Sequence, residues 1–449
     1  MNGATGTNVR VLLFSPYCYP LTGAEAIVSA KLAITLLNAG LEVDVITHSE
    51  VARYYPETDG PFWSRLRDAL HPVPALPGAT RHILRSTPLV WSLRALRCAR
   101  RLMTRARYDV IISRATPQYG HLPALLLSGS AGVPWVANWS DPMPPAKAPP
   151  PYGLGPEARI GYLAKTYLDA VCRKADWHTF PAERLRSYFL RYQPSIRAKS
   201  SVIPHVAVIG INAGIAGRDE VFTISCSGSL THRDPTPFLK AFRSFLDTPA
   251  VSGMARAIFT GPTLAGIKQL VARMALEEWV TTEDVGTYEN VLARTATSHV
   301  ALNIETQEGE GIFLPSKIAD IVQTGTPILT LSPRGGTVHE LLQHSGGGIA
   351  VGGSDVEEIR AALVCLYQAW RDGSLMARYG SDRLLSLFGE DTVMESYRRV
   401  FRTIRVGVSS RTQMTTSVRE SQAAATRETD TVEDVPPDPV IQYSAKARH

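Results

Sequence analysis

A strand, loop and helix alternate twice along the chain, and this repeated order restricts the fold more than any other sequence feature. The first series starts with the apolar run 9–15, continues through the helix-like segment 24–40 and reaches a second apolar run at 41–48. Runs at 108–113 and 133–138 extend it. Because strands joined through a helix pair in parallel, this order predicts a parallel sheet covered by helices.

The same order begins again at 221–230 and predicts a second sheet of the same kind. The 449 residues exceed what one hydrophobic core usually serves, and 44% of them are hydrophobic, which is enough for two cores. The expected fold is therefore α/β, with two Rossmann-like domains. Further strands of the second sheet are expected at 256–262, 279–286, 299–304, 327–332 and 347–352.

The expected parts of the chain are an N-terminal domain at 1–204, a linker at 205–218, a C-terminal domain at 219–388, a helix at 389–406 and a tail at 407–449. The linker is placed from the Gly- and Ala-rich run 201–217, which has no helical period. We expect the late helix to pack against the N-terminal domain. The tail is polar and poor in aromatic residues, so we expect it to be disordered.

Cysteine usage and hydropathy exclude several classes of protein. The five cysteines are scattered without a CxxC pair or a zinc-like spacing, so neither a disulfide framework nor a bound metal is expected. Residues 1–10 lack the apolar run of a signal peptide, and no run of about 18 apolar residues predicts a membrane span. These features favour a cytoplasmic location.

The net charge of +6 is unevenly distributed, because residues 81–107 contain eight arginines and no acidic residue. Two interpretations of this segment stay open. Leucines such as Leu89 and Leu93 interleave with the arginines, as in a helix that lies on an anionic membrane, here the inner face of the plasma membrane. The alternative is the solvated face of an ordinary helix. No recognised module supports nucleic-acid binding.

Glycine-bearing turns between strands and helices are candidate phosphate sites, because backbone N–H groups at a helix N-terminus bind anions. Gly23 precedes the segment 24–40, and Gly228 and Arg233 follow the first strand of the second series. Each turn is a weak signal by itself, since any Rossmann-like domain contains several.

The segment 308–329, EGEGIFLPSKIADIVQTGTPIL, is the most specific of these turns. Pro315 stands at an expected helix start, and Lys317 lies in the first turn. The helix dipole disfavours a cation there, so Lys317 gains most when an anion shares the site. The alternative is a lysine that extends into solvent.

Seven long stretches of the chain carry a pattern that extends over both expected domains. They are 15–25, 108–127, 132–142, 175–189 leading into 202–206, 226–242, 284–304 and 312–331. In this order they resemble the GT-B glycosyltransferases, specifically the family 4-like group that makes bacterial surface polysaccharides and other glycans. The resemblance covers nearly all of 9–404 and implies two Rossmann-like domains that face each other across a cleft. It places the nucleotide-sugar donor mainly on the C-terminal domain and the acceptor mainly on the N-terminal one.

The resemblance implies roles for residues of the donor side. Arg233 and Lys317 fall on or near the basic pair that holds the diphosphate, and Asp320 matches the acidic residue that binds the ribose hydroxyls. The backbone at Val285 and Gly286 matches the base site. The donor-binding residues expected are Gly23, Gly228, Arg233, Gly286, Phe313, Leu314, Pro315, Ser316, Lys317 and Asp320.

This chain departs from the family pattern at two positions. The acidic residue that should stand eight positions before Asp320 is Ile312, although Glu308 and Glu310 lie close by, and we take Glu310 as a candidate catalytic residue. The arginine that usually follows the first glycine of the C-terminal domain is Ser229.

On the acceptor side, Asp141 follows an expected strand and is the first candidate for a general base or acceptor ligand. An Asp before Pro is also a common turn former. His121 is a second candidate, although an isolated histidine is often structural.

Together these features imply transfer of a sugar from a nucleotide-sugar donor to a saccharide or lipid-linked acceptor in glycan or cell-surface polysaccharide biosynthesis. Retention of the anomeric configuration is expected, without metal or other cofactor. Two alternatives stay open: a nucleotide-sugar epimerase on the same scaffold, and a degenerate homologue that binds a nucleotide sugar or a partner, suggested by Ile312. The sugar, base, acceptor, linkage and oligomeric state are not specified.

Overall fold

The computed structural model describes residues 9–19, 23–49, 61–74, 87–209, 217–248, 251, 254–261, 264–284, 286–307 and 309–405. By internal contacts the chain divides into Met1–Phe401 and Arg402–His449. The first unit holds both predicted sheets, and residues 402–405 of the second are helical. The tail 407–449 lies outside the described residues.

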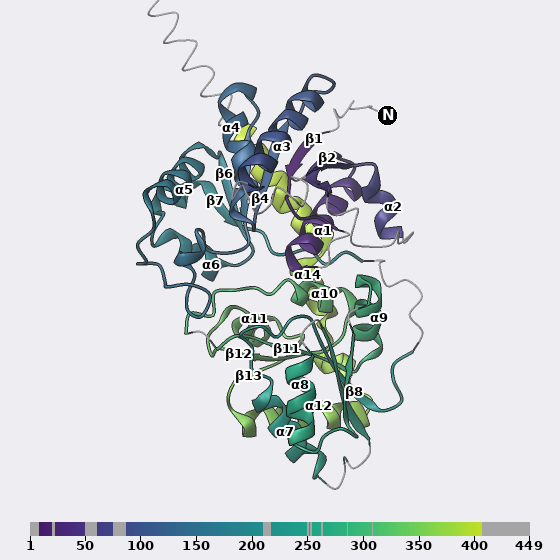
Figure 1. Cartoon of the computed structure of the whole chain (residues 1–449). Coiled ribbons are helices and arrows are strands. Elements are labelled where there is room, and N and C mark those ends of the chain that lie inside the picture. The colour runs from purple at the N-terminus through teal and green to yellow at the C-terminus, as the bar shows by residue number, and fades with distance from the viewer. Residues whose placement is uncertain are drawn as a thin grey trace, which may run out of the picture. The chain divides into compact units, whose positions relative to one another are not determined.

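The first sheet has seven parallel strands in the order β3-β2-β1-β4-β5-β6-β7. Figure 1 labels β1, β2, β4, β6 and β7 of this sheet. The central strands β1 and β4 are buried almost throughout, as expected for a parallel sheet covered on both faces. The strands are β1 (Arg10–Phe14), β2 (Glu42–His48), β3 (Leu70–Val73), β4 (Val110–Ala115), β5 (Trp135–Trp139), β6 (Trp177–Phe180) and β7 (Ser200–Val202).

Helices connect these strands, and α1 is the most deeply buried of those described. Its residues from Ala26 to Leu36 are all buried. α4 ends at Gly132, whose positive φ of 62° is the left-handed conformation that commonly closes a helix. The helices are α1 (Ala24–Asn38), α2 (Pro61–Arg67), α3 (Thr87–Met103), α4 (Leu122–Ala131), α5 (Tyr162–Lys174) and α6 (Glu183–Leu190), with 3₁₀ turns at Gln118–His121, Pro145–Lys147 and Pro194–Lys199.

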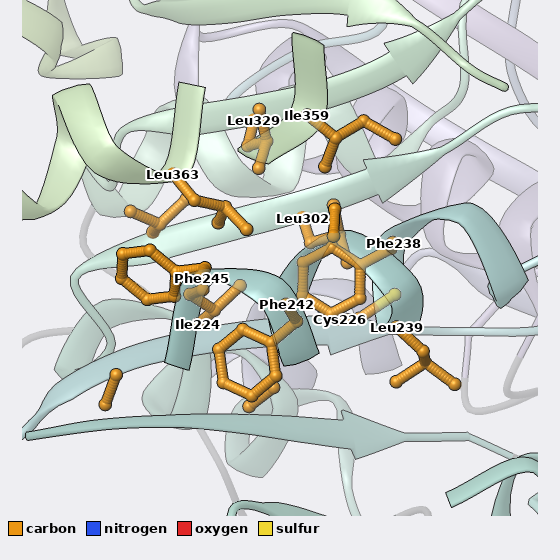
Figure 2. Close-up of a cluster of buried hydrophobic side chains, with 14 of the residues drawn as sticks. Ile224, Cys226, Phe238, Leu239, Phe242, Phe245, Leu302, Leu329, Ile359 and Leu363 are labelled. Carbon is orange, nitrogen blue, oxygen red and sulfur yellow. The ribbon is translucent and has the colours of Figure 1, made fainter. Parts of the chain in front are cut away.

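The second sheet has six parallel strands in the order β10-β9-β8-β11-β12-β13. A large hydrophobic core lies where α7 (Thr236–Leu246) and α12 (Val356–Arg371) pack on β8, β11 and β12. Figure 2 shows Phe238, Phe242 and Phe245 of α7 in this cluster. Burying one such side chain stabilises the fold by about 1.5–3 kcal/mol. The strands are β8 (Phe222–Ser227), β9 (Ala255–Thr260), β10 (Val280–Glu283), β11 (Val300–Ile304), β12 (Ile328–Ser332) and β13 (Gly348–Gly352).

The helices of the second half are α7 (Thr236–Leu246), α8 (Ala265–Arg273), α9 (Tyr288–Thr297), α10 (Lys317–Thr324), α11 (Thr337–Ser345), α12 (Val356–Arg371), α13 (Leu375–Tyr379) and α14 (Leu385–Phe388), with a 3₁₀ turn at Ser381–Leu384. Residues 390–401 form part of a last helix. Its Glu390 accepts a hydrogen bond from Asn38 of α1 at 2.8 Å. Val393 and Tyr397 line a small cavity together with Val28 and Leu32 of α1.

The α/β fold with two parallel sheets is confirmed, and each strand-like run identified in the sequence forms a strand. Three strands of the first sheet, β3, β6 and β7, were not predicted. They are three or four residues long and carry Ser, His or Pro in place of an apolar pattern, so pairing with a neighbouring strand defines them. β7 includes Ser201 and Val202 of the run from which the linker was inferred.

In each sheet the strand order reverses next to the first strand in the chain: β1 lies between β2 and β4, and β8 between β9 and β11. At such a point the connecting helices leave toward opposite faces and open a crevice beyond the carboxyl ends of the strands. The fold therefore places a ligand site at the ends of β1 and β4 and of β8 and β11.

Candidate functional site

A cavity of about 810 Å³ lies where these strand ends meet. The first half of the protein, residues 9–209 with the first sheet, contributes the start of α1 and the residues that follow β4 and β5. The second half is residues 217–388, with the second sheet. The second half contributes residues at the ends of β8, β9 and β11 and at the start of α10. A pocket of this size is typical of sites for small ligands and cofactors.

Two basic side chains, Lys317 and Arg233, lie on the second half's side of the cavity. Lys317 is the first residue of α10, and its Nζ atom donates to the carbonyl oxygen of Ser227 at 3.1 Å. Arg233 donates through Nη1 to the carbonyl oxygen of Ser229 at 2.9 Å, while its buried Nε has no partner among the described residues. Burial lowers the pKa of Lys317, and the nearby Arg233 charge lowers it further. An anion bound between Lys317 and Arg233 would raise the pKa of Lys317 and so offset both effects.

Asp320, also on α10, lines the cavity at the level of its first turn. Its Oδ1 atom accepts from the Tyr288 hydroxyl at 2.6 Å and pairs with Nζ of Lys31 at 2.8 Å. Lys31 belongs to α1, so the ion pair joins the two halves of the protein.

Glu305 is a cavity residue that the sequence analysis did not single out. It directly follows β11, is 6% exposed, and its Oε1 accepts from the Asn303 side chain at 3.1 Å. Burial raises its pKa to about 8 against the opposing effects of Thr330, Arg233 and Lys317. Its place at the carboxyl end of a central parallel strand is the signal that could have identified it.

The first half contributes two carboxylates to the cavity, Asp141 and Glu25. Asp141 follows β5 and accepts from the Thr116 hydroxyl at 2.8 Å. Burial raises its pKa. It stands beside Ser140, whose hydroxyl donates to Glu25.

Glu25, in the first turn of α1, was not predicted as a site residue. Its Oε2 atom lies 3.2 Å from Arg114 Nη2 and 3.1 Å from the Ser140 hydroxyl. Burial raises its pKa to about 7, although Arg114 opposes the shift, and the Asp141 charge raises it further. A carboxyl group that titrates near neutrality can accept or donate a proton at physiological pH.

Most of the sequence-predicted residues meet in this cavity, but two do not. His121 is fully buried against the first sheet, where Nδ1 lies 2.7 Å from the Ser113 hydroxyl and the ring packs on Trp139. Desolvation lowers its pKa well below the ordinary value, so the ring is neutral. The predicted residues that line the cavity are Gly23, Asp141, Gly228, Arg233, Gly286, Phe313, Leu314, Pro315, Ser316, Lys317 and Asp320.

Glu310 also lies away from the cavity lining. It forms a two-bond ion pair with Arg191, with both N–O distances at 2.7 Å. Ile312 is 1% exposed and packs in a hydrophobic cluster with side chains of the first half. Neither residue therefore supplies the missing acidic group to the cavity, and Glu308 and Val285 lie outside the described residues.

Within the described ranges, no group of three or more His, Cys, Asp and Glu side chains has the arrangement of a metal site. No helix in that part of the chain is long and apolar enough to cross a membrane.

Two parallel sheets with this strand order, joined at one cavity, define the GT-B fold of glycosyltransferases. Residues 22–205 match the family model of the glycosyl transferase 4-like domain. The resemblance expected from the sequence is thereby confirmed for the fold and for this domain. A comparison with curated proteins finds no match.

Solved structures with the same fold include sucrose-phosphate synthase from Thermosynechococcus elongatus, at 14% identity over 89% of this chain and 100% of that one, with a TM-score of 0.63. HepE from Anabaena in complex with UDP is 13% identical over 88% and 100%, with a TM-score of 0.58. A putative UDP-N-acetylglucosamine 2-epimerase from Listeria monocytogenes is 12% identical over 88% and 96%, with a TM-score of 0.54. At these identities the likeness concerns the fold.

Proposed function

We propose that this protein transfers a sugar from a nucleoside diphosphate sugar to a hydroxyl group of a saccharide or lipid-linked acceptor. The observation that carries the proposal is the composition of the cavity. On one side the cavity is lined by two basic groups, Lys317 and Arg233, and by the carboxyl groups of Asp320 and Glu305. On the other side it is lined by Asp141 and Glu25. A transferase needs this division, because one side must stabilise an anionic leaving group while the other binds the hydroxyl that attacks.

On the donor side, Lys317 and Arg233 bind the diphosphate, and Asp320 binds the ribose. In the reaction the bond between the anomeric carbon and the β-phosphate oxygen breaks, and its electron pair stays on the leaving diphosphate. Preorganised cations stabilise that developing charge most effectively in a site from which water is excluded. Because both cations are supplied by side chains, we propose that the reaction proceeds without a bound metal.

On the acceptor side, Asp141 and Glu25 bind the attacking hydroxyl group. Its oxygen forms the new bond to the anomeric carbon, and its proton passes either to a carboxylate of this pair or to the departing phosphate. We propose retention of configuration, as the family 4-like resemblance implies, so the hydroxyl approaches from the face that the diphosphate leaves.

For the nucleotide we propose UDP as the first candidate, because HepE has been solved with UDP and with UDP-glucose. The test is a thermal-shift screen of the purified chain with UDP, GDP, ADP, CMP and dTDP and their common sugars. A ligand that binds the folded state alone raises the unfolding midpoint. Stabilisation by one nucleotide and transfer of its labelled sugar to an acceptor would support the proposal, and stabilisation by none would contradict it.

Burial of Ile312 in a hydrophobic cluster favours one alternative, a homologue that binds a nucleotide sugar without transferring it. This alternative predicts a thermal shift without turnover. An epimerase on the same scaffold would instead convert the donor sugar in the absence of any acceptor. Analysis of the sugar after incubation with the donor alone separates these cases.

The basic helix α3 supports the further proposal of a peripheral contact with an anionic membrane, where a lipid-linked acceptor would be reached. Leu89 and Leu93 are 50% and 44% exposed, whereas Leu96 of the same helix is buried. Arg81 and Arg85 lie outside the described residues. Flotation with vesicles of anionic lipid at low salt tests this contact, and protein that stays at the bottom of the gradient would refute it.

A further inference from the structure

A buried lysine of the first half, Lys31, contacts Asp320, which lines the donor side of the cavity. Lys31 lies in α1 within the buried stretch from Ala26 to Leu36 and is 2% exposed. A buried ammonium group is strongly unfavourable unless it is paired. Its partner is Asp320 of the second half, with a distance of 2.8 Å between Nζ and Oδ1.

The carboxylate of Asp320 is held from two directions at the same oxygen. Oδ1 accepts from Lys31 and, at 2.6 Å, from the Tyr288 hydroxyl of α9. No side chain in the described ranges donates to Oδ2, although Asp320 lines the cavity. One oxygen is therefore used by the protein, and the other is available to a ligand.

We propose that Lys31 is a positioning residue for the nucleotide donor. It fixes the orientation of the Asp320 carboxylate, which accepts hydrogen bonds from the ribose 2′ and 3′ hydroxyls. This inference rests on the proposed function, since it requires a ribonucleotide in the cavity. It goes further by making donor affinity depend on α1 of the opposite half, so that the donor site is complete only when α1 lies against α10.

An alternative role for Lys31 is to hold the two halves together without any effect on the ribose. The two roles differ in one measurable quantity, the preference for a ribonucleotide over its 2′,3′-dideoxy analogue. If Lys31 positions Asp320, its replacement lowers the affinity only for ligands that have the ribose hydroxyls. If Lys31 is purely structural, its replacement lowers the affinity for both ligands equally.

The experiment measures, by calorimetry on the full chain, the Kd of UDP and of 2′,3′-dideoxy-UDP, or of the corresponding pair for whichever nucleotide the screen selects. Native protein should prefer the ribonucleotide by about tenfold, the size of a charge-assisted hydrogen bond. Lys31→Met and Asp320→Asn should each remove most of that preference while the affinity for the dideoxy analogue stays within about twofold. Lys31→Arg should keep part of it.

Lys240→Met, which removes an exposed lysine of α7, is the matched control and should bind as the native chain does. Lys31→Gln, which keeps a polar end group, replaces Lys31→Met if the latter does not fold. Undiminished ribose preference in the Lys31 variants, or equal weakening of both ligands, would overturn the inference while the proposed function stands. Native protein that binds no nucleotide of the screen would overturn both.

Discussion

Lys317 Nζ donates to the carbonyl oxygen of Ser227 at 3.1 Å, which holds the ammonium group at the carboxyl end of β8. Beside it the backbone turns at Gly228, whose φ is +99°, and a Cβ atom there would lie 4.0 Å from Nζ. The close approach of a lysine and a glycine turn at a strand end is suited to an oxygen-rich anion.

Replacing Lys317 should therefore weaken anion binding. Lys317→Ala is expected to raise the Kd of the nucleoside diphosphate by about tenfold or more, because one charge-assisted contact is lost. Lys317→Arg, which keeps the charge, should lose less. Calorimetric titration gives both values, and an unchanged Kd in Lys317→Ala would show that the phosphates bind elsewhere.

Asp141 should affect turnover more than donor binding, because it faces the cavity from the opposite half. Asp141→Asn keeps the size of the side chain and its contact with Thr116 but removes the charge. We expect kcat for transfer to fall by about a hundredfold, the contribution typical of a group that handles a proton. The Kd of the nucleotide should remain as in the native chain, and a matching loss of both would argue for a structural role.

Glu25 should impose a pH dependence on transfer near neutrality. Its pKa is raised to about 7, so the carboxylate that can accept a hydrogen bond from an acceptor forms as the pH rises through that value. The rate should rise over this range in the native chain and be low and flat in Glu25→Gln. Ser140→Ala removes a hydrogen bond that lowers this pKa, so in this variant the rise of the transfer rate should shift to higher pH. If the rate rises at the native pH in both variants, a group other than Glu25 is responsible for the pH dependence.

Glu305 should make folding stability depend on pH in the opposite direction from an ordinary ion-paired carboxylate. Its pKa in the folded protein is raised from 4.5 to about 8, so between these values the folded state binds more protons than the unfolded state. The contribution of Glu305 to the free energy of unfolding is complete below pH 4.5. It then falls by up to about 1.4 kcal/mol for each unit by which the pH rises.

Denaturant unfolding of Glu305→Gln across this range provides the check. The variant should gain stability relative to the native chain as the pH approaches 8 from below. If the difference in unfolding free energy between the two proteins stays constant with pH, Glu305 does not titrate in this range.

The loop before α10 offers a stability test with an internal control. A Cβ atom at Gly311 would lie 2.4 Å from the Cα atom of Gly336, and the φ of Gly311 is +52°. Gly311→Ala should thus destabilise the protein by about 2 kcal/mol or more, because the added methyl group would strain the backbone at positive φ and overpack against Gly336. At Gly309 a Cβ atom meets nothing within 4 Å, so Gly309→Ala should be nearly neutral in the same thermal unfolding assay.

The order of strands and helices, and with it the two-sheet fold, could be predicted from the sequence because apolar periodicity is a local property of consecutive residues. Several site residues followed from the same local order. Gly228, Lys317 and Asp141 lie in turns after strands or at helix starts, and parallel sheets bring such turns together at one edge. Asp320 was expected from the resemblance to the family 4-like group.

The remaining site residues depend on contacts between distant parts of the chain, which only the tertiary structure decides. Lys31 and Asp320 are 289 positions apart, and nothing near either residue indicates the other. Burial, which raises the pKa of Glu25 and Glu305, is likewise a property of the packed molecule. His121 has a local sequence that suits a site, but packing turns its ring into the core. Local pattern thus determined where backbone turns stand, whereas packing decided which side chains face the ligand and with what charge.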